Sequence, residues 1–265
     1  MTLAARQPTL FLPHGGGPCF FMDDPAGVWM GMAAFLRTVS ARLPSAPKAL
    51  LVVSGHWETD GFALTGAERP SLIYDYSGFP PDTYQLRYDA PGDPLLARRA
   101  QDLLRHKQLP ATVDTLRGLD HGVFIPLKVA FPSADIPVVE MSVDRSLDPA
   151  LHLAAGRALA PLRDDGVLII ASGMSFHNMR GYGDPRFTAP SEEFDRWLMQ
   201  SLAMDPEARA RRLEAWADAP SARLSHPQAE HLLPLMVAAG AADGQGRRIY
   251  SEQVLKTAIS GFEFV

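Results

Sequence analysis

The sequence predicts an α/β fold: a single domain with a mostly parallel central sheet and helices on both faces. Short apolar runs are nearly continuous rather than alternating, as strands are when helices cover both faces of their sheet. Amphipathic segments fall between these runs. This alternation of strand and helix is typical of a parallel sheet sandwiched between helices.

Four apolar runs are predicted to be buried strands, at residues 9–13, 49–54, 136–143 and 167–172. Residues 247–252 and 257–265 are expected to close the sheet as a pair of strands. Apolar residues spaced by three and four predict four helices. Their apolar faces are Trp29, Met32, Leu36, Val39 and Leu43; Leu96, Ala100, Leu103 and Leu104; Leu151, Ala155, Leu159 and Leu162; and Phe194, Trp197, Leu198 and Leu202. Ser191 is a candidate N-cap for the last of these helices.

Two stretches interrupt the alternation. Residues 57–93 are rich in glycine, proline and tyrosine, and residues 178–190 form a second Gly/Pro-rich loop. Long ordered loops are usually functional, so the first is expected to contribute to a site. No linker, low-complexity tract or internal repeat divides the chain, which predicts one catalytic domain over residues 1–265.

Composition excludes several classes of protein. The 265 residues carry a net charge of −5, which argues against nucleic acid as a partner because such grooves need a basic stripe. The apolar runs are far shorter than a membrane span, and the first residues lack the order of a signal peptide. The single cysteine, Cys19, rules out an intrachain disulfide. We expect a cytoplasmic globular protein, with a homo-oligomer left open.

Three histidines follow buried strands at similar positions. His14 follows the run TLFLP, His56 follows ALLVVSG, and His177 follows LIIASGMSF. A lone histidine at a strand end is more often a hydrogen-bonded structural residue. Because ligands of open α/β sheets bind at the carboxyl ends of strands, three such histidines are expected to converge in one pocket. Three imidazoles with an open position suit a catalytic zinc or iron ion.

The segment after His14 is Gly15-Gly16-Gly17-Pro18. Its glycines let the backbone approach a ligand closely. A phosphate-binding loop is a weaker interpretation, because neither a Lys-Ser/Thr pair nor the GxGxxG spacing is present. A tight turn between strand and helix is the simplest alternative. Cys19 is interpreted as a small buried apolar residue rather than a thiolate ligand.

The remaining histidines are less specific. His121 is placed in a loop beside Asp120, either as a substrate-binding residue or as a solvated one. A helix starting at residues 225–226 would hold His231 in its first turn and give His231 or Glu230 a route into the pocket. A capped surface helix is the alternative there. The two others, His106 and His152, are expected on helix surfaces.

Taken in order, these residues resemble the class III extradiol ring-cleavage dioxygenases, in particular the DOPA 4,5-dioxygenase-like branch. Proteins of this type form the catalytic component of aromatic ring-opening dioxygenases. The resemblance runs from about residue 9 to the end of the chain. The matching blocks are His14-Gly, Ser-Gly-His56-Trp, Tyr74-Asp-Tyr-Ser-Gly-Phe-Pro, Tyr88-Asp-Ala-Pro-Gly-Asp-Pro, Asp-His121-Gly, Ser-Gly-Met-Ser-Phe-His177-Asn and Glu-His231-Leu-Leu-Pro-Leu.

The resemblance implies a non-heme metal in a strand-end pocket, held by His14, His56 and His231. It gives His177 the role of acid/base, close enough to be a fourth metal ligand, and it gives His121 contact with substrate or dioxygen. Fe(II) is expected for activity, with Zn(II) as the alternative ion in the purified protein. The usual facial triad has two histidines and one carboxylate, whereas the C-terminal part of this chain offers Glu230-His231. The family's His-Gly-Ser-Pro turn is here His14-Gly-Gly-Gly-Pro, which is one residue longer.

The function expected from this resemblance is opening of the ring of a catechol-type substrate, DOPA-like or another 4-substituted catechol, with dioxygen. The expected partners are therefore a small aromatic diol and dioxygen. Two alternatives belong to other classes. One is a non-catalytic metal-binding or interaction protein of the same fold, and the other is a Zn-dependent hydrolase in which Glu230 serves as general base.

Overall fold

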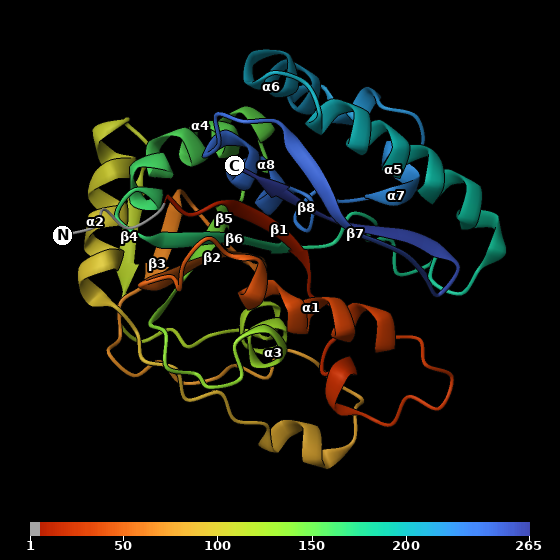
Figure 1. Cartoon of the computed structure of the whole chain (residues 1–265), viewed down its shortest axis with the longest axis horizontal. Coiled ribbons are helices and arrows are strands. Elements are labelled where there is room, and N and C mark those ends of the chain that lie inside the picture. The colour runs from red at the N-terminus through yellow and green to blue at the C-terminus, as the bar shows by residue number, and fades with distance from the viewer. Residues whose placement is uncertain (1–5) are drawn as a thin grey trace.

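A twisted sheet of eight strands forms the centre of the computed structural model, which describes residues 6–265 (Figure 1). The strands lie in the order β4-β3-β5-β2-β6-β1-β8-β7. Their bounds are β1 Thr9–Pro13, β2 Ala49–Thr59, β3 Phe62–Thr65, β4 Ala111–Asp114, β5 Val138–Asp144, β6 Val167–Gly173, β7 Gly246–Val254 and β8 Thr257–Phe264. Pairs β1–β6, β6–β2, β2–β5 and β3–β4 are parallel, while β3–β5, β1–β8 and β7–β8 are antiparallel. The predicted α/β class with a mostly parallel sheet is confirmed.

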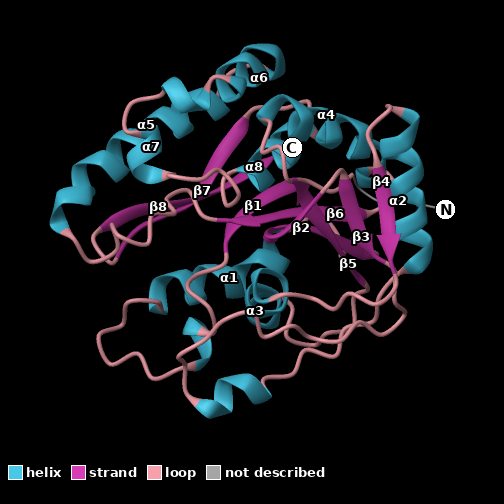
Figure 2. Cartoon of the chain, turned by 180° about the vertical axis from the view of Figure 1, so that it is seen from behind, coloured by secondary structure: helices cyan, strands magenta, loops and turns pink. Residues whose placement is uncertain are grey.

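Helices cover both faces of the sheet (Figure 2). One face is covered by α1 (Met30–Arg42) and α3 (His121–Ala130), and the other by α2 (Pro94–His106), α4 (Pro149–Leu159) and α8 (Leu233–Gly240). The helices α5 (Thr188–Leu202), α6 (Pro206–Glu214) and α7 (Ala222–Ser225) lie on the second side (Figure 1). The short 3-10 helices are Cys19–Phe21, Pro81–Gln85, Ala160–Arg163, Pro185–Phe187 and Trp216–Asp218.

The central strands explain why the core has two halves. Along β2, Leu50 and Val52 pack with α1 and α3, while Leu51 and Val53 pack on the opposite face with α4 and α8. Alternate side chains of a strand point to opposite faces, so a strand covered on both sides must be apolar at every position. This is why β2 begins as the continuous run ALLVV.

Asp-Pro pairs start three of the helices. Asp93 precedes Pro94 at the start of α2, and its carboxylate accepts the backbone N–H groups of Leu95 and Leu96. The same arrangement starts α4 at Asp148 and α6 at Asp205. Aspartate accepts otherwise unpaired N–H groups, and proline at the first helical position loses no intrahelical hydrogen bond.

Several local predictions are wrong. The 57–93 stretch is not all loop, because β2 continues to Thr59 and β3 follows at Phe62. Residue Ser191 is not an N-cap: α5 begins at Thr188, and the Ser191 hydroxyl donates to the Thr188 carbonyl instead. His121 does not lie in a loop but is the first residue of α3. The short strand β4 and the polar helix α6 were not predicted.

The predicted helix start at residues 225–226 is also wrong. α7 ends at Ser225, and His226 has a non-helical backbone (φ −132°, ψ 88°) because the following Pro227 disfavours the helical conformation before it. The next helix, α8, begins only at Leu233 with Pro234 in its first turn, so His231 precedes a helix rather than lying within one.

Two further local predictions concern single residues. His152 is buried rather than on a helix surface, since its Nδ1 donates to the Asp148 carbonyl and its Nε2 accepts the backbone N–H of Asp144. Cys19 is buried, as predicted, and burial raises its pKa to about 12, so it is a neutral thiol. Among the described residues, no helix is long and apolar enough to cross a membrane.

Candidate active site

Five histidines from distant parts of the chain gather at the carboxyl ends of the central strands. His14 directly follows β1, and His56 lies in β2 just beyond Ser54, where the pairing of β2 with β6 ends. His121 begins α3, His177 follows β6, and His231 precedes α8. The ring centroid of His56 lies 4.0 Å from that of His121, 4.6 Å from that of His231 and 5.0 Å from that of His14.

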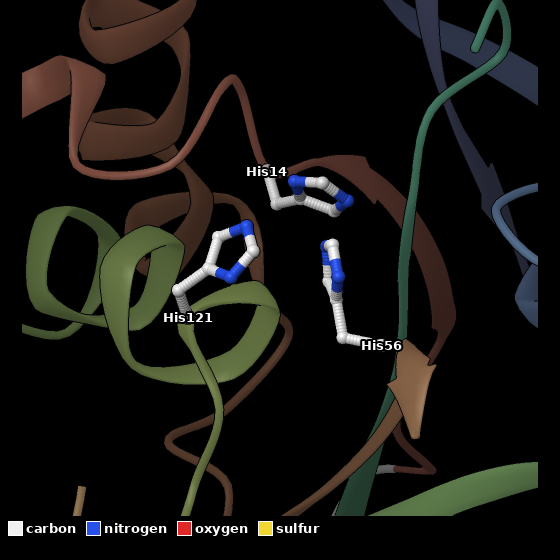
Figure 3. Close-up of side chains that lie close together, drawn as sticks. All are labelled: His14, His56 and His121. Atoms are coloured by element: carbon white, nitrogen blue, oxygen red, sulfur yellow. The ribbon is translucent and has the colours of Figure 1, made fainter. Parts of the chain in front are cut away.

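Figure 3 shows the rings of His14, His56 and His121 converging from three separate segments. The His177 ring stacks on His231 with a centroid distance of 3.4 Å. The convergence predicted for His14, His56 and His177 is therefore present, and His121 and His231 join it. These last two positions were the least specific in the sequence, because neither follows a strand.

Hydrogen bonds fix the tautomers of two of these rings. The Nδ1 of His14 lies 3.0 Å from the Gly15 carbonyl oxygen, which can only accept, so Nδ1 carries the proton. The Nε2 of His14 is buried and has no hydrogen-bond partner among the described residues. The Nδ1 of His231 donates to Glu230 Oε1 at 2.9 Å, and the Nε2 of His231 lies 3.2 Å from the Nε2 of His56. Unprotonated Nε2 atoms thus point into one small volume.

This arrangement fits a metal ion. Donor atoms of His14, His56 and His121 lie within 4.8 Å of one another, as do those of His177, Glu230 and His231. Burial, and then the neighbouring histidines, lower the pKa of His14 well below its ordinary value and the pKa of His56 to about 4. These imidazoles are therefore neutral near pH 7, which is the form that binds metals. A buried polar atom usually has a hydrogen-bond partner, and the Nε2 of His14 has none among the described residues, as expected if this atom binds a metal ion.

Two carboxylates orient the histidines from behind. The Oδ1 of Asp75 accepts both the Nδ1–H of His121 at 2.8 Å and the His121 backbone N–H at 2.9 Å. Burial is the largest single influence and would raise the pKa of Asp75, but the ring and backbone hydrogen bonds from His121, together with the charge interactions with His121 and His56, lower that pKa. Glu230 likewise faces His231 and His177, and its Oε1 lies 3.4 Å from the Nδ1 of His177. Hydrogen bonds from these two rings help to lower the pKa of Glu230 despite its burial.

The sequence did not predict a role for Asp75, which belongs to the aromatic block Tyr74-Asp-Tyr. The Asp–His pair suggested by the sequence was Asp120 with His121. Asp120 instead accepts the Ser54 hydroxyl at 2.9 Å and lies 3.3 Å from the Arg117 guanidinium. Adjacent side chains at a helix start diverge, so the true partner of His121 comes from a loop forty-six positions away.

Two strand glycines let the segment that contains His231 approach the sheet. A Cβ on Gly55 would lie 2.6 Å from the Glu230 carbonyl oxygen, closer than side-chain carbons come in proteins. A Cβ on Gly173 would clash with the His231 carbonyl oxygen. Glycine at these positions in β2 and β6 is therefore required for the Glu230–His231 segment to reach His56 and His177.

A cavity of about 550 Å³ opens onto this cluster, and His14, His56, His121 and His177 line it. Its volume lies in the range of roughly 300–1,000 Å³ that holds small-molecule ligands. Tyr76 and Phe79 from the aromatic loop line the same cavity. The prediction that this loop contributes to the site is therefore confirmed for these two side chains.

Comparison with known proteins identifies the family of this chain. The family model described as the catalytic LigB subunit of aromatic ring-opening dioxygenase matches residues 8–263. A 4,5-DOPA dioxygenase extradiol from Beta vulgaris is 40% identical over 88% of this chain and 86% of its own length. The 4,5-DOPA dioxygenase extradiol of Escherichia coli (strain K12) is 37% identical over 91% of this chain and 88% of its own. A crystal structure of an uncharacterized protein from Escherichia coli K12 superposes with a TM-score of 0.78 at 31% identity, covering 98% of this chain and 100% of the other.

An α/β sheet that presents buried imidazoles at its strand ends defines a class of enzyme with a histidine-rich catalytic centre. Within that class, this chain belongs to the family of class III extradiol ring-cleavage dioxygenases. It is accordingly an oxidoreductase, and membership implies a catalytic metal, an aromatic substrate and dioxygen. The resemblance noted in the sequence is confirmed.

Proposed function

We propose that the chain opens the ring of a DOPA-like or other 4-substituted catechol, with His14, His56 and His231 as the metal ligands. The observation that carries the ligand set is the buried Nε2 of His14, which has no hydrogen-bond partner within residues 6–265 and lies beside His56 and His231, whose Nε2 atoms are 3.2 Å apart. Two imidazole nitrogens bonded to one ion at about 2.0–2.1 Å lie at such a separation. The relatives named 4,5-DOPA dioxygenase extradiol support the substrate.

We expect Fe(II) in the active enzyme, with Zn(II) as an alternative occupant of the same donors. When bound, the ion supplies Lewis acidity and, in the case of iron, the redox chemistry that dioxygen requires. Glu230 serves to orient rather than to act as a hydrolytic base, because its Oε1 accepts the Nδ1–H of His231. Such an outer carboxylate fixes the ring and its tautomer so that Nε2 faces the ion.

His177 is proposed as the acid/base residue that takes the proton of a catechol hydroxyl and later returns it. It lines the cavity, it is partly accessible at 20% of its side chain, and Glu230 holds its Nδ1 side. A positioned histidine of this kind contributes roughly 10²–10⁴-fold to turnover. The His177 ring also stacks on the ring of His231, so we include His177 in the proposal as a fourth metal ligand.

His121 is proposed to contact the substrate or dioxygen. Because its Nδ1–H is donated to Asp75, its Nε2 has a free lone pair to accept a hydrogen bond. Asp75 is thus a positioning residue in this scheme. We also propose that residues 1–265 make one catalytic domain, since β1 and β8, from the two ends of the chain, pair with each other in the middle of the order β6-β1-β8-β7.

The test is anaerobic reconstitution with Fe(II), verified by metal analysis, followed by addition of dioxygen and a panel of catechols. We expect oxygen uptake and a yellow semialdehyde product. Zinc-loaded protein serves as the control and should give no colour, because Zn²⁺ has no redox chemistry. No oxygen uptake across a broad panel at full iron occupancy would refute the proposed function and favour a non-catalytic metal-binding protein.

A further inference from the structure

Beyond the histidines, the cavity has a wall of aromatic and sulfur-containing side chains. Trp29, Tyr76, Phe79 and Tyr182 line it, together with apolar residues that include Met179. The volume of about 550 Å³ places it among cavities that hold molecules larger than one ring. A catechol bound at the histidines therefore leaves room for a ring substituent, and the rest of the wall determines which substituents fit.

The charged side chains of this wall, histidines apart, are both acidic. Asp23 and Asp24 line the cavity, whereas no lysine or arginine does so within residues 6–265. Both carboxylate oxygens of Asp24 accept backbone N–H groups, from Val28 at 2.9 Å and from Trp29 at 2.8 Å, which fixes the orientation of Asp24. Asp23 is exposed and makes no side-chain hydrogen bond or ion pair in the described chain, so its charge is available.

A continuous path joins the histidines to these acids along the loop after β1. The Tyr76 ring meets the His121 ring edge-on at 5.7 Å, and Phe79 packs against Gly17. Next along this loop, Gly16 lies against the Trp29 indole, where a Cβ would be 3.4 Å from the ring. Trp29 and the two acids line the same cavity as the histidines, and the Asp24 carboxylate accepts the backbone N–H of Trp29, so the indole and the acids lie next to each other on this wall.

Basic residues near the cavity mouth do not offset these acids within the cavity. Arg180 and Lys256 are exposed neighbours of the lining residues Met179 and Leu255, but neither lines the cavity itself. Lys256 lies close enough to Asp184 to help lower the pKa of that carboxyl, so part of its charge is already compensated.

We propose that this site selects catechols whose ring substituent carries an ammonium group and discriminates against those whose substituent carries a carboxylate alone. An ammonium group gains attraction to Asp23 and Asp24 and a cation–π contact with Trp29. A carboxylate would lose water and find no cationic partner on this wall, which is unfavourable. This inference rests on the proposed function, because it assumes that the ring binds at the histidines.

The experiment compares three catechols of similar size that differ in charge: 4-(2-aminoethyl)catechol, 4-propylcatechol and 3-(3,4-dihydroxyphenyl)propionate. Iron-loaded protein should show a kcat/KM about tenfold or more higher for the amine than for the acid, with the neutral catechol between them; tenfold corresponds to about 1.4 kcal/mol. Added salt should reduce the preference, since partly exposed charges are screened. Equal values, or a preference for the acid, would overturn the proposal.

Asp23→Asn should lower kcat/KM for the amine more than for 4-propylcatechol or the acid, and so remove most of this selectivity. Asp102→Asn is the matched control, because Asp102 is exposed on α2 and does not line the cavity. The same order of affinities should appear when zinc-loaded protein is titrated with the three catechols by calorimetry, which needs no turnover. Absence of turnover together with this binding order would refute the proposed activity but uphold the selectivity, so the two can fail separately.

Discussion

His121 and Asp75 form an imidazole–carboxylate pair in which one oxygen of Asp75 accepts both the ring Nδ1–H and the backbone N–H of His121. The pair fixes the ring and the first turn of α3 at once. Across the site, Glu230 does the same for the ring of His231. Each side of the cluster therefore has an acid behind its imidazoles, and both acids come from segments without regular secondary structure.

The first prediction concerns Asp75→Asn. Loss of the charged acceptor should weaken the hold on the His121 ring and lower kcat by about 10- to 100-fold, as changes to such outer partners do. Bound metal, measured by elemental analysis, should stay near one equivalent, because Asp75 hydrogen-bonds to His121 and lies 3.8 Å from the Nδ1 of His56, beyond hydrogen-bond distance of this proposed ligand. Asp75→Glu should recover part of the loss. An unchanged kcat in Asp75→Asn would remove Asp75 from the site.

A second prediction separates ligands from the acid/base. His14→Ala should lose the metal and with it all turnover, because His14 Nε2 is buried among the other donors. His177→Ala should keep most of the metal and lose roughly 10²–10⁴-fold in kcat. Metal analysis and kinetics on the same preparations decide between the two roles. Full metal content in His14→Ala would contradict the proposed ligand set.

How much of this site was predictable follows from where its residues lie. His14, His56 and His177 could be identified because each follows an apolar run, and the carboxyl ends of parallel strands meet at one edge of a sheet. Asp75 lies in a loop whose path depends on packing against α3, and no local pattern encodes that path. Short elements such as β4, with four residues, were not predicted for a related reason. Pairing with neighbouring strands stabilises them, and they are too short to show a periodic pattern of their own.

The error at residues 225–231 has a similar origin. Two prolines offer two places for a helix to begin, and local rules do not choose between Pro227 and Pro234. The contact of the Glu230–His231 segment with Gly55 and Gly173 depends on the tertiary structure, and it keeps this segment out of a helix and against the strand ends. The sequence therefore identified His231 as a candidate, with its ligand role implied by the family resemblance, but placed it in the wrong local structure.

A third prediction follows from that contact. Gly55→Ala puts a methyl group against the Glu230 carbonyl oxygen, so the Glu230–His231 segment must move away from β2. Overpacking of this kind costs about 1–3 kcal/mol of stability. It should also reduce metal affinity, because His231 is displaced from His56. Metal affinity measured by competition with a chelator, alongside urea unfolding, tests both effects, and unchanged metal affinity would show that the contact does not position His231.

The last prediction concerns pH and a histidine behind the site. Burial lowers the pKa of His226 to about 4, although its hydrogen bond to the Ser175 carbonyl favours the charged form. In the unfolded chain a histidine titrates near 6.5, so between these values the unfolded state binds more protons. The stability from keeping His226 neutral is therefore complete above pH 6.5 and is lost as pH falls toward 4, amounting to roughly 3 kcal/mol at about 1.36 kcal/mol per pKa unit.

In metal-free protein, the free energy of unfolding measured with urea should decline in this way from pH 7.5 to 4.5. Its slope against pH should be shallower in His226→Gln and unchanged in His106→Gln, whose histidine is exposed on α2. A His226→Gln slope equal to that of the parent protein would show that His226 does not contribute to the pH dependence.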